Sequence, residues 1–108
     1  MARIAVAGGA GGLGKSIVEA IRKGSKHHVV ILSRHEQQDP AAVVIDYSSV
    51  ENLRGVLERE NVDTVVSTIG AYTHVHHQSQ LNLIEAAELT PSVKRFIPSE
   101  FGFQIRPE

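Results

Sequence analysis

The sequence contains no cysteine, which excludes disulfide bonds, thiol catalysis and zinc sites built on thiolates. It also lacks an excess of either charge: the formal net charge is −1, so electrostatics offer no reason to expect a nucleic-acid or anionic-membrane partner. No apolar run approaches the roughly 18–20 residues that a membrane span requires. The first residues lack the apolar segment of a secretory signal. These absences predict a cytoplasmic protein that binds neither nucleic acid nor membrane.

Short apolar runs alternate with amphipathic segments along the 108 residues. Strands are expected at 4–7, 29–32, 42–45, 62–68 and within 93–98, and helices at about 12–23, after Ser48 or Ser49, and at about 76–89. Apolar strands that alternate with helices imply a parallel sheet covered on both faces. The chain is therefore predicted to form one α/β domain over residues 1–108, a doubly wound parallel sheet of about five strands with ligands at their carboxyl ends.

One connection in this pattern is short. Only residues 33–41 separate the second and third apolar runs, whereas a parallel crossover usually takes about a dozen residues or more. Either this crossover has no helix, or the third run is a short or irregular strand.

A glycine-rich loop, Gly8-Gly-Ala-Gly-Gly-Leu-Gly-Lys-Ser16, directly follows the first apolar run. A strand, a glycine loop and a helix together place backbone N–H groups and a helix N-terminus against a phosphate. The loop fits three patterns: G-x-G-x-x-G from Gly9, a looser G-x-x-G-x-x-G from Gly8, and the nucleotidase pattern G-x-x-x-x-G-K-[ST] ending at Ser16. All three predict phosphate binding, but they predict different chemistry.

Two features bear on the choice between these patterns. In a dinucleotide turn the helix starts near the second glycine, whereas in a nucleotidase loop it starts near the lysine, here Lys15. Arg34 lies twenty residues beyond Gly14, where a dinucleotide fold places the residue that recognises the adenosine ribose. An arginine offers a forked cation to a 2′-phosphate, so it favours NADP, with NAD as the alternative cofactor.

The stretch Lys94-Arg-Phe-Ile-Pro-Ser-Glu-Phe-Gly102 resembles the K-R-F-[FI]-P-S-E-F-G signature of the NmrA-like and isoflavone-reductase-like proteins, atypical members of the short-chain dehydrogenase superfamily. Four other segments resemble that family in the same order along the chain: the glycine loop, residues 31–34, the Asp-Tyr-Ser at 46–48, and residues 66–70 with the helix after them. The resemblance covers essentially the whole chain and implies a Rossmann-type NAD(P)-binding domain. Beside it, the nucleotidase pattern becomes a weak alternative.

The resemblance also implies roles for individual residues. Backbone groups around Gly11, Gly12 and Leu13, within the loop of Gly8, Gly11 and Gly14, should hold the pyrophosphate, and Ser33 with Arg34 should hold the 2′-phosphate. Thr68 and Gly70 should line the adenosine side. The segment from Pro98 and Ser99 to Phe101 should approach the nicotinamide end.

The catalytic residues are not identified. In the reductases that this chain resembles, the lysine acting as general acid or base and the substrate lobe lie beyond the Pro-Ser-Glu-Phe-Gly loop, here residues 98–102, and the sequence runs to Glu108. The chain is therefore expected to be the N-terminal part of such a fold. Two functions stay open: an NADPH-dependent reductase that transfers hydride to a small organic substrate, and a non-catalytic NAD(P) sensor that signals through a protein partner. An unprotected edge at the fifth strand would favour self-association.

The remaining polar residues offer weaker signals. His74, His76 and His77 diverge around a helix and lack a nearby carboxylate, so a metal site is not expected and a solvated loop beside the cofactor is. Tyr47 and Tyr72 are the two tyrosines, and the positions four residues after them hold glutamate and histidine. The Tyr-x-x-x-Lys pair of ordinary short-chain dehydrogenases is therefore absent.

Overall fold

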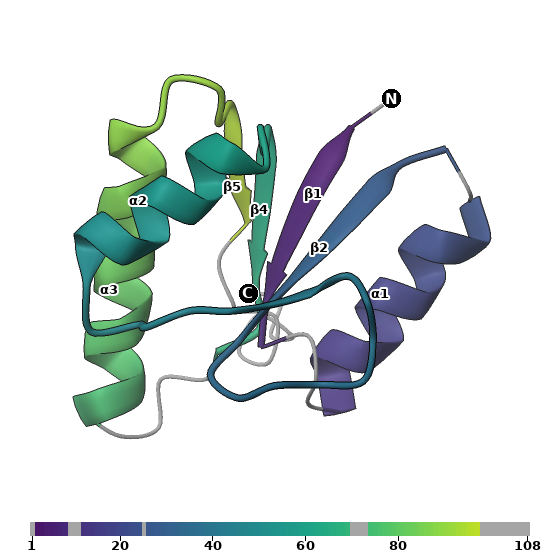
Figure 1. The fold of residues 1–108 in the computed structure, drawn as a ribbon, viewed down its shortest axis with the longest axis horizontal. Helices are drawn as coiled ribbons and strands as arrows, with labels where there is room; N and C mark the ends of the chain where they lie inside the picture. Colours follow the sequence, from purple (N-terminus) through teal and green to yellow (C-terminus); the bar gives the residue numbers. More distant parts are fainter. Residues whose placement is uncertain (1, 9–11, 25, 70–73, 98–108) are drawn as a thin grey trace, which may run out of the picture.

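Five strands form one parallel sheet with helices on both faces in the computed structural model, which describes residues 2–8, 12–24, 26–69 and 74–97 (Figure 1). The elements follow one another as β1 (Arg3–Ala7), α1 (Gly12–Gly24), β2 (His28–Ser33), β3 (Ala42–Val44), α2 (Val50–Arg59), β4 (Thr64–Ser67), α3 (His74–Leu89) and β5 (Arg95–Ile97). The predicted alternation of strands and helices is confirmed.

The strand order is β3-β2-β1-β4-β5, and every neighbouring pair is parallel. The chain winds outward from β1 to β3, then returns to the other side of β1 and continues to β5. The reversal lies between β1 and β4, and in open sheets of this kind ligands bind beyond the carboxyl ends of the strands at such a switch point. Gly8 and Thr68 are the residues that follow these two strands.

Two apolar clusters hold the helices against opposite faces of the sheet. On one face, Leu53 and Leu57 of α2 and Leu83 of α3 pack with Val30 and Val65 of the strands. On the other face, Val18 of α1 packs with strand residues that include Val6 and Ile31. Figure 1 shows this division, with α1 on one side of the sheet and α2 and α3 on the other. Because both faces are covered in this region, the strand residues are apolar throughout rather than alternating.

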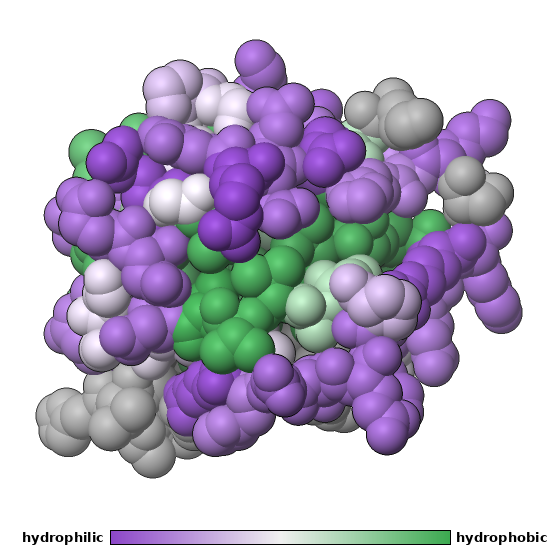
Figure 2. Space-filling view, in the orientation of Figure 1, coloured by the Kyte–Doolittle hydropathy of each residue, from purple (hydrophilic) through white to green (hydrophobic). Residues whose placement is uncertain are grey.

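The connection from β2 to β3 contains no helix, as one of the two sequence interpretations predicted, and β3 is also only three residues long. The amide of Ile31 donates to the Ala41 carbonyl at 2.9 Å, which brings the end of the crossover back to β2. β3 forms one edge of the described sheet, and the side chain of Val44 there is 51% exposed. In the orientation of Figure 1, the molecular surface has a band of hydrophobic residues across its middle, surrounded by hydrophilic residues (Figure 2).

Two sequence expectations need refinement. The N-cap of α2 is Ser49 and not Ser48: the Ser49 side chain accepts a hydrogen bond from the Asn52 amide at 3.0 Å. The helix expected at about 76–89 begins two residues earlier, at His74, so the three histidines that were expected in a solvated loop beside the cofactor lie in the first turn of α3. Its sequence, His-Val-His-His, contains a single apolar residue, so it lacks the apolar spacing by which a helix is recognised in a sequence.

The part of the chain that the structure describes contains no helix long and apolar enough to cross a membrane. Among the same residues, no three histidine, aspartate or glutamate side chains are grouped to hold a metal ion.

Candidate functional site

Four residues that are distant in sequence meet at the carboxyl edge of the sheet. Gly8 follows β1, Arg34 follows β2, Tyr47 lies shortly after β3, and Thr68 follows β4. They come together because the strands are parallel, so all of them end at the same edge.

Gly8 occupies a position that only glycine fits well. Its φ angle is +78°, and a Cβ atom there would lie 2.6 Å from the Thr68 Oγ1. Thr68 is held in place because its hydroxyl and its amide both donate to the Ala7 carbonyl, at 2.7 and 2.9 Å. The residues that follow β1 and β4 are therefore in direct contact. Glycine at position 8 allows the backbone to turn at the end of β1 without a clash with Thr68.

The glycine loop leads into α1 in the manner of a dinucleotide turn. The helix has begun by Gly12, before Lys15, so Lys15 and Ser16 lie within it. A nucleotidase loop would begin its helix near the lysine. The first amides of a helix have no partner within it, so the backbone N–H groups at the start of α1, from Gly12 to Gly14, are not used by the helix itself. Gly14 is buried in this first turn, and α1 as a whole packs against β1 and β2.

Tyr47 closes a set of hydrogen bonds at this edge. Its side chain is 6% exposed, and its hydroxyl donates to the Leu32 carbonyl at 3.0 Å and accepts from the Gly8 amide at 3.2 Å. The Gly8 amide also reaches the Leu32 carbonyl at 3.3 Å. Burial raises the pKa of the Tyr47 phenol, an effect larger than the lowering by the Gly8 amide and the Arg34 charge. The hydroxyl therefore stays protonated and able to donate.

Arg34 lies over the ring of Tyr47. The central carbon of its guanidinium is 5.7 Å from the ring centroid, within the range of a cation–π contact. The two side chains border a hollow of about 400 Å³, whose other lining residues are Ile45, Asp46, Ser48 and Ser79. Asp46 accepts hydrogen bonds from the Ser48 hydroxyl and amide, which lower the pKa of its carboxyl group. The hollow thus has a cation at one side and a carboxylate at another.

Ser33 turns its hydroxyl into the crossover. The side chain is buried, and its hydroxyl donates to the His35 carbonyl at 2.7 Å while accepting from the His35 amide at 3.2 Å. The Gln37 amide group approaches the same oxygen at 3.3 Å. These bonds shape the turn that carries Arg34. The proton of Ser33 is therefore committed to the protein, and donation to a phosphate would require the bond to His35 to break.

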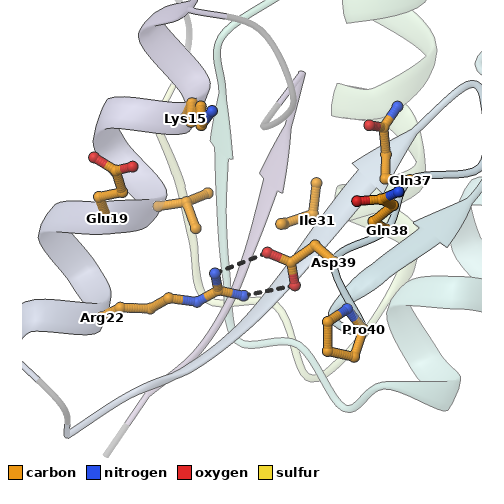
Figure 3. A pocket seen from close by; sticks show the side chains of 9 residues that line it. Lys15, Glu19, Arg22, Ile31, Gln37, Gln38, Asp39 and Pro40 are labelled. Atoms are coloured by element: carbon orange, nitrogen blue, oxygen red, sulfur yellow. Dashed lines mark hydrogen bonds and ion pairs between the residues drawn. The ribbon is translucent and has the colours of Figure 1, made fainter.

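A second hollow of about 670 Å³ lies on the other side of this turn, between α1 and the crossover (Figure 3). Arg22 of α1 makes a two-pronged ion pair across it with Asp39, at 2.8 and 2.9 Å. The hydrogen bond from Arg22, followed by that from the Ala41 amide, lowers the pKa of Asp39 to about 2. The pair ties the crossover that carries Arg34 to α1.

Of the predicted cofactor-binding residues, the structure brings Gly8, Arg34 and Thr68 together at one edge. Ser33 is the last residue of β2, and it is buried. Gly11, Gly70, Pro98 and Ser99 lie outside the described residues, and the side chain of Leu13 is not described either. Sequence reasoning missed Tyr47, which it considered only as half of a catalytic Tyr-Lys pair. The Asp-Tyr-Ser segment after the third strand was the available signal.

Comparison with known proteins gives one family. Residues 1–106 match the NmrA-like family. The chain is 43% identical over 108 residues to Oxidoreductase BOA1 of Botryotinia fuckeliana, covering 94% of this chain and 36% of that protein. It is 29% identical over 115 residues to Isoflavone reductase homolog A622 of Nicotiana glauca, covering 95% of this chain and 36% of that one. The chain therefore spans about a third of the length of these relatives.

Solved structures resemble the fold over a similar range. A UDP-N-acetylglucosamine 4-epimerase from Bacillus cereus superposes with a TM-score of 0.76 at 29% identity, over 91% of this chain and 36% of that one. The binary complex of leucoanthocyanidin reductase with NADPH from Vitis vinifera superposes with a TM-score of 0.74 at 26% identity, over 90% and 33% of the two chains. The five-stranded parallel sheet is thus a Rossmann-type fold, and the recognition of the family from the sequence is confirmed.

Proposed function

Because this chain belongs to the NmrA-like family, we propose that it binds NADP(H) at the carboxyl edge of its sheet and positions the cofactor for hydride transfer to a small organic substrate. A nicotinamide dinucleotide, when bound, supplies the hydride, and the protein contributes binding and orientation. The proposal includes two specific claims: the site prefers NADP to NAD, and the whole protein is a reductase.

The position of Arg34 over Tyr47 is the observation that carries the proposal. The ring lies within cation–π range of the guanidinium, 5.7 Å from its central carbon, and the N–H groups of a guanidinium point outward in its plane. A phosphate at the end of β2 could accept two of these N–H groups at once, the paired arrangement in which arginine makes its strongest hydrogen bonds. A ribose 2′-hydroxyl would instead be bound best by a carboxylate at this position.

The rest of the site fits the other parts of a dinucleotide. The start of α1 at Gly12 offers backbone N–H groups to a pyrophosphate, and Gly8 lets the end of β1 pack closely against Thr68. We assign the adenosine to the hollow between Arg34 and Ser79, with Thr68 and Gly70 along its edge. Pro98 and Ser99 are proposed to face the nicotinamide end.

The relatives favour a reductase over a sensor without turnover, because the two reported above are named as an oxidoreductase and an isoflavone reductase homolog. The start of α1 before Lys15 favours the dinucleotide over the nucleotidase interpretation.

A titration of the purified protein with NADPH, NADH and magnesium–ATP, followed by calorimetry, tests the proposal. NADPH should bind most tightly. Arg34→Ala should raise the dissociation constant of NADPH by about ten- to a hundredfold, as expected for the loss of charge-assisted hydrogen bonds. The dissociation constant of NADH should change much less in this variant. Arg54→Ala is the matched control, since Arg54 lies on α2 and pairs with Glu51 and Glu58. Magnesium-dependent ATP binding without NADPH binding would overturn the proposal.

Hydride transfer is tested separately, on the full-length protein. Loss of NADPH absorbance with small carbonyl or unsaturated compounds, dependent on the protein, is the expected result. Cofactor binding with no turnover on any such compound would favour the sensor.

A further inference from the structure

Tyr47 connects two parts of the proposed cofactor site that the sequence treats separately. Its ring lies under the Arg34 guanidinium, and its hydroxyl contacts the Gly8 amide at 3.2 Å. Arg34 belongs to the 2′-phosphate end of the proposed site and Gly8 to the loop beside the pyrophosphate. One side chain therefore contacts both.

We propose that Tyr47 is a positioning residue for cofactor selectivity: its ring holds Arg34 where a 2′-phosphate meets the guanidinium, and its hydroxyl holds the glycine loop at Gly8. The inference rests on the proposed NADP(H) site, because it explains how that site is organised before the cofactor arrives.

The ring matters because Arg34 is otherwise an exposed side chain on a turn. A long arginine side chain loses rotamer freedom when it binds a phosphate, and this loss weakens binding. A ring that already attracts the guanidinium, 5.7 Å from its central carbon, reduces this loss. The benefit applies to a cofactor with a 2′-phosphate and not to one without it.

The hydroxyl acts on a different part of the site. It donates to Leu32 at 3.0 Å and accepts from Gly8 at 3.2 Å, so it joins the end of β2 to the start of the glycine loop. Both NADPH and NADH carry a pyrophosphate, so this contact affects the two cofactors equally. The ring and the hydroxyl are thus separable by substitution.

Tyr47 is itself held from the opposite side. The Asn82 side chain on α3 donates to the Tyr47 carbonyl at 2.9 Å, and the Asp46 amide donates to Asn52 of α2 at 2.8 Å. Two helices therefore fix the backbone of this segment. The ring is a rigid support rather than a side chain free to follow Arg34.

The test measures the ratio of the dissociation constants of NADH and NADPH in three variants. Tyr47→Phe keeps the ring and removes the hydroxyl, so it should weaken both cofactors by one common factor, at most about tenfold, and keep the ratio. Tyr47→Leu removes the ring, and the ratio should fall about three- to fivefold. In an Arg34→Ala background, Tyr47→Leu should lower the ratio no further, because the ring acts through Arg34.

A third replacement guards against loss of folding in Tyr47→Leu. Pentafluorophenylalanine incorporated at position 47 has nearly the shape of phenylalanine but lacks the negative face that attracts a cation. The ratio should fall relative to Tyr47→Phe at equal thermal stability.

The outcomes separate the two claims. An unchanged ratio in Tyr47→Leu and in the fluorinated protein, with wild-type preference for NADPH intact, would overturn the role of Tyr47 and leave the proposed function standing. A fall of the ratio in Tyr47→Phe as large as in Tyr47→Leu would also overturn the role of the ring. If the wild-type protein shows no preference for NADPH, the proposed function fails and this inference fails with it.

Discussion

The Gly8 backbone and the Thr68 hydroxyl are packed so closely that a Cβ atom on residue 8 would lie 2.6 Å from Oγ1. The contact joins the ends of β1 and β4 at the switch point of the sheet, and it sets the space in which the glycine loop begins. Residue 8 must therefore be glycine for two reasons: a Cβ atom would clash with Thr68, and its φ angle of +78° is one that other residues rarely adopt.

Replacing Gly8 by alanine should lower the free energy of unfolding by about 2–4 kcal/mol, because the left-handed backbone and the close contact both oppose a Cβ. Chemical denaturation measures it. Gly55→Ala is the matched control: Gly55 lies in α2, and a Cβ added there would meet no atom within 4 Å, so alanine should stabilise by about 1 kcal/mol. Adding Thr68→Ala to Gly8→Ala should restore part of the lost stability, because it removes the clash with Oγ1 but leaves the strain of a positive φ angle at residue 8. Equal effects at Gly8 and Gly55 would contradict the packing described.

The Arg22–Asp39 pair should make stability depend on pH at the acid end. The pKa of Asp39 is lowered in the folded state to about 2 from an ordinary 3.8. A carboxyl group with a lowered folded pKa stabilises the protein above its unfolded pKa, and this contribution is lost as the pH falls from about 4 towards 2.

Arg22→Gln should be less stable than the wild type near neutral pH by under about 1 kcal/mol, since the pair is partly exposed. The two unfolding curves should converge towards pH 2. Urea denaturation at several pH values checks this, with Arg54→Gln as a control in an exposed helix pair. A difference that stays constant down to the acid limit would argue against the role of Asp39.

Ser49 should matter more for α2 than its neighbour Ser48. Ser49→Ala removes the cap bond to the Asn52 amide and should cost about 1 kcal/mol, or about 4–8 °C in the melting temperature. Ser48→Ala removes an exposed bond to Asp46 and should cost less. Melting curves of the two variants side by side decide the order.

Lys15 separates the dinucleotide from the nucleotidase interpretation. In a nucleotidase loop, the lysine contacts the nucleotide phosphates directly, and its loss abolishes binding. Here Lys15 lies inside α1 and beside the hollow closed by Arg22 and Asp39 (Figure 3). Lys15→Ala should therefore change the NADPH dissociation constant by less than about threefold. A loss of more than a hundredfold would restore the nucleotidase loop as the better explanation.

The β5 edge leads to a prediction about association. β5 lies at one edge of the described sheet, and its Ile97 side chain is 40% exposed. Unpaired strand edges promote pairing with another chain, so light scattering at micromolar concentration should detect self-association of this 108-residue chain. Ile97→Lys should reduce it, because a charge on an edge strand opposes pairing. A monomer at all concentrations would rule out association through this edge.

The sequence predicted features that depend on neighbouring residues. Apolar runs placed the strands, the spacing of Leu53 and Leu57 placed α2, and the nine residues between the second and third runs indicated a crossover without a helix. The start of α3 at His74, two residues before the predicted one, escaped this reasoning because a single apolar residue in the first turn sets no spacing. The choice of Ser49 as the cap also escaped it, since both serines are adequate caps and only the helix start decides between them.

By itself, the sequence determined the family, the α/β fold class and the place of the glycine loop between β1 and α1, because these follow from local patterns and from a motif of consecutive residues. The tertiary structure decided which distant residues meet. The hydrogen bond between Gly8 and Tyr47 joins residues 39 positions apart, and nothing local to either residue indicates it. It exists because the strand order puts β1 beside β2 and β2 beside β3, so that their carboxyl ends, and the residues after them, share one edge.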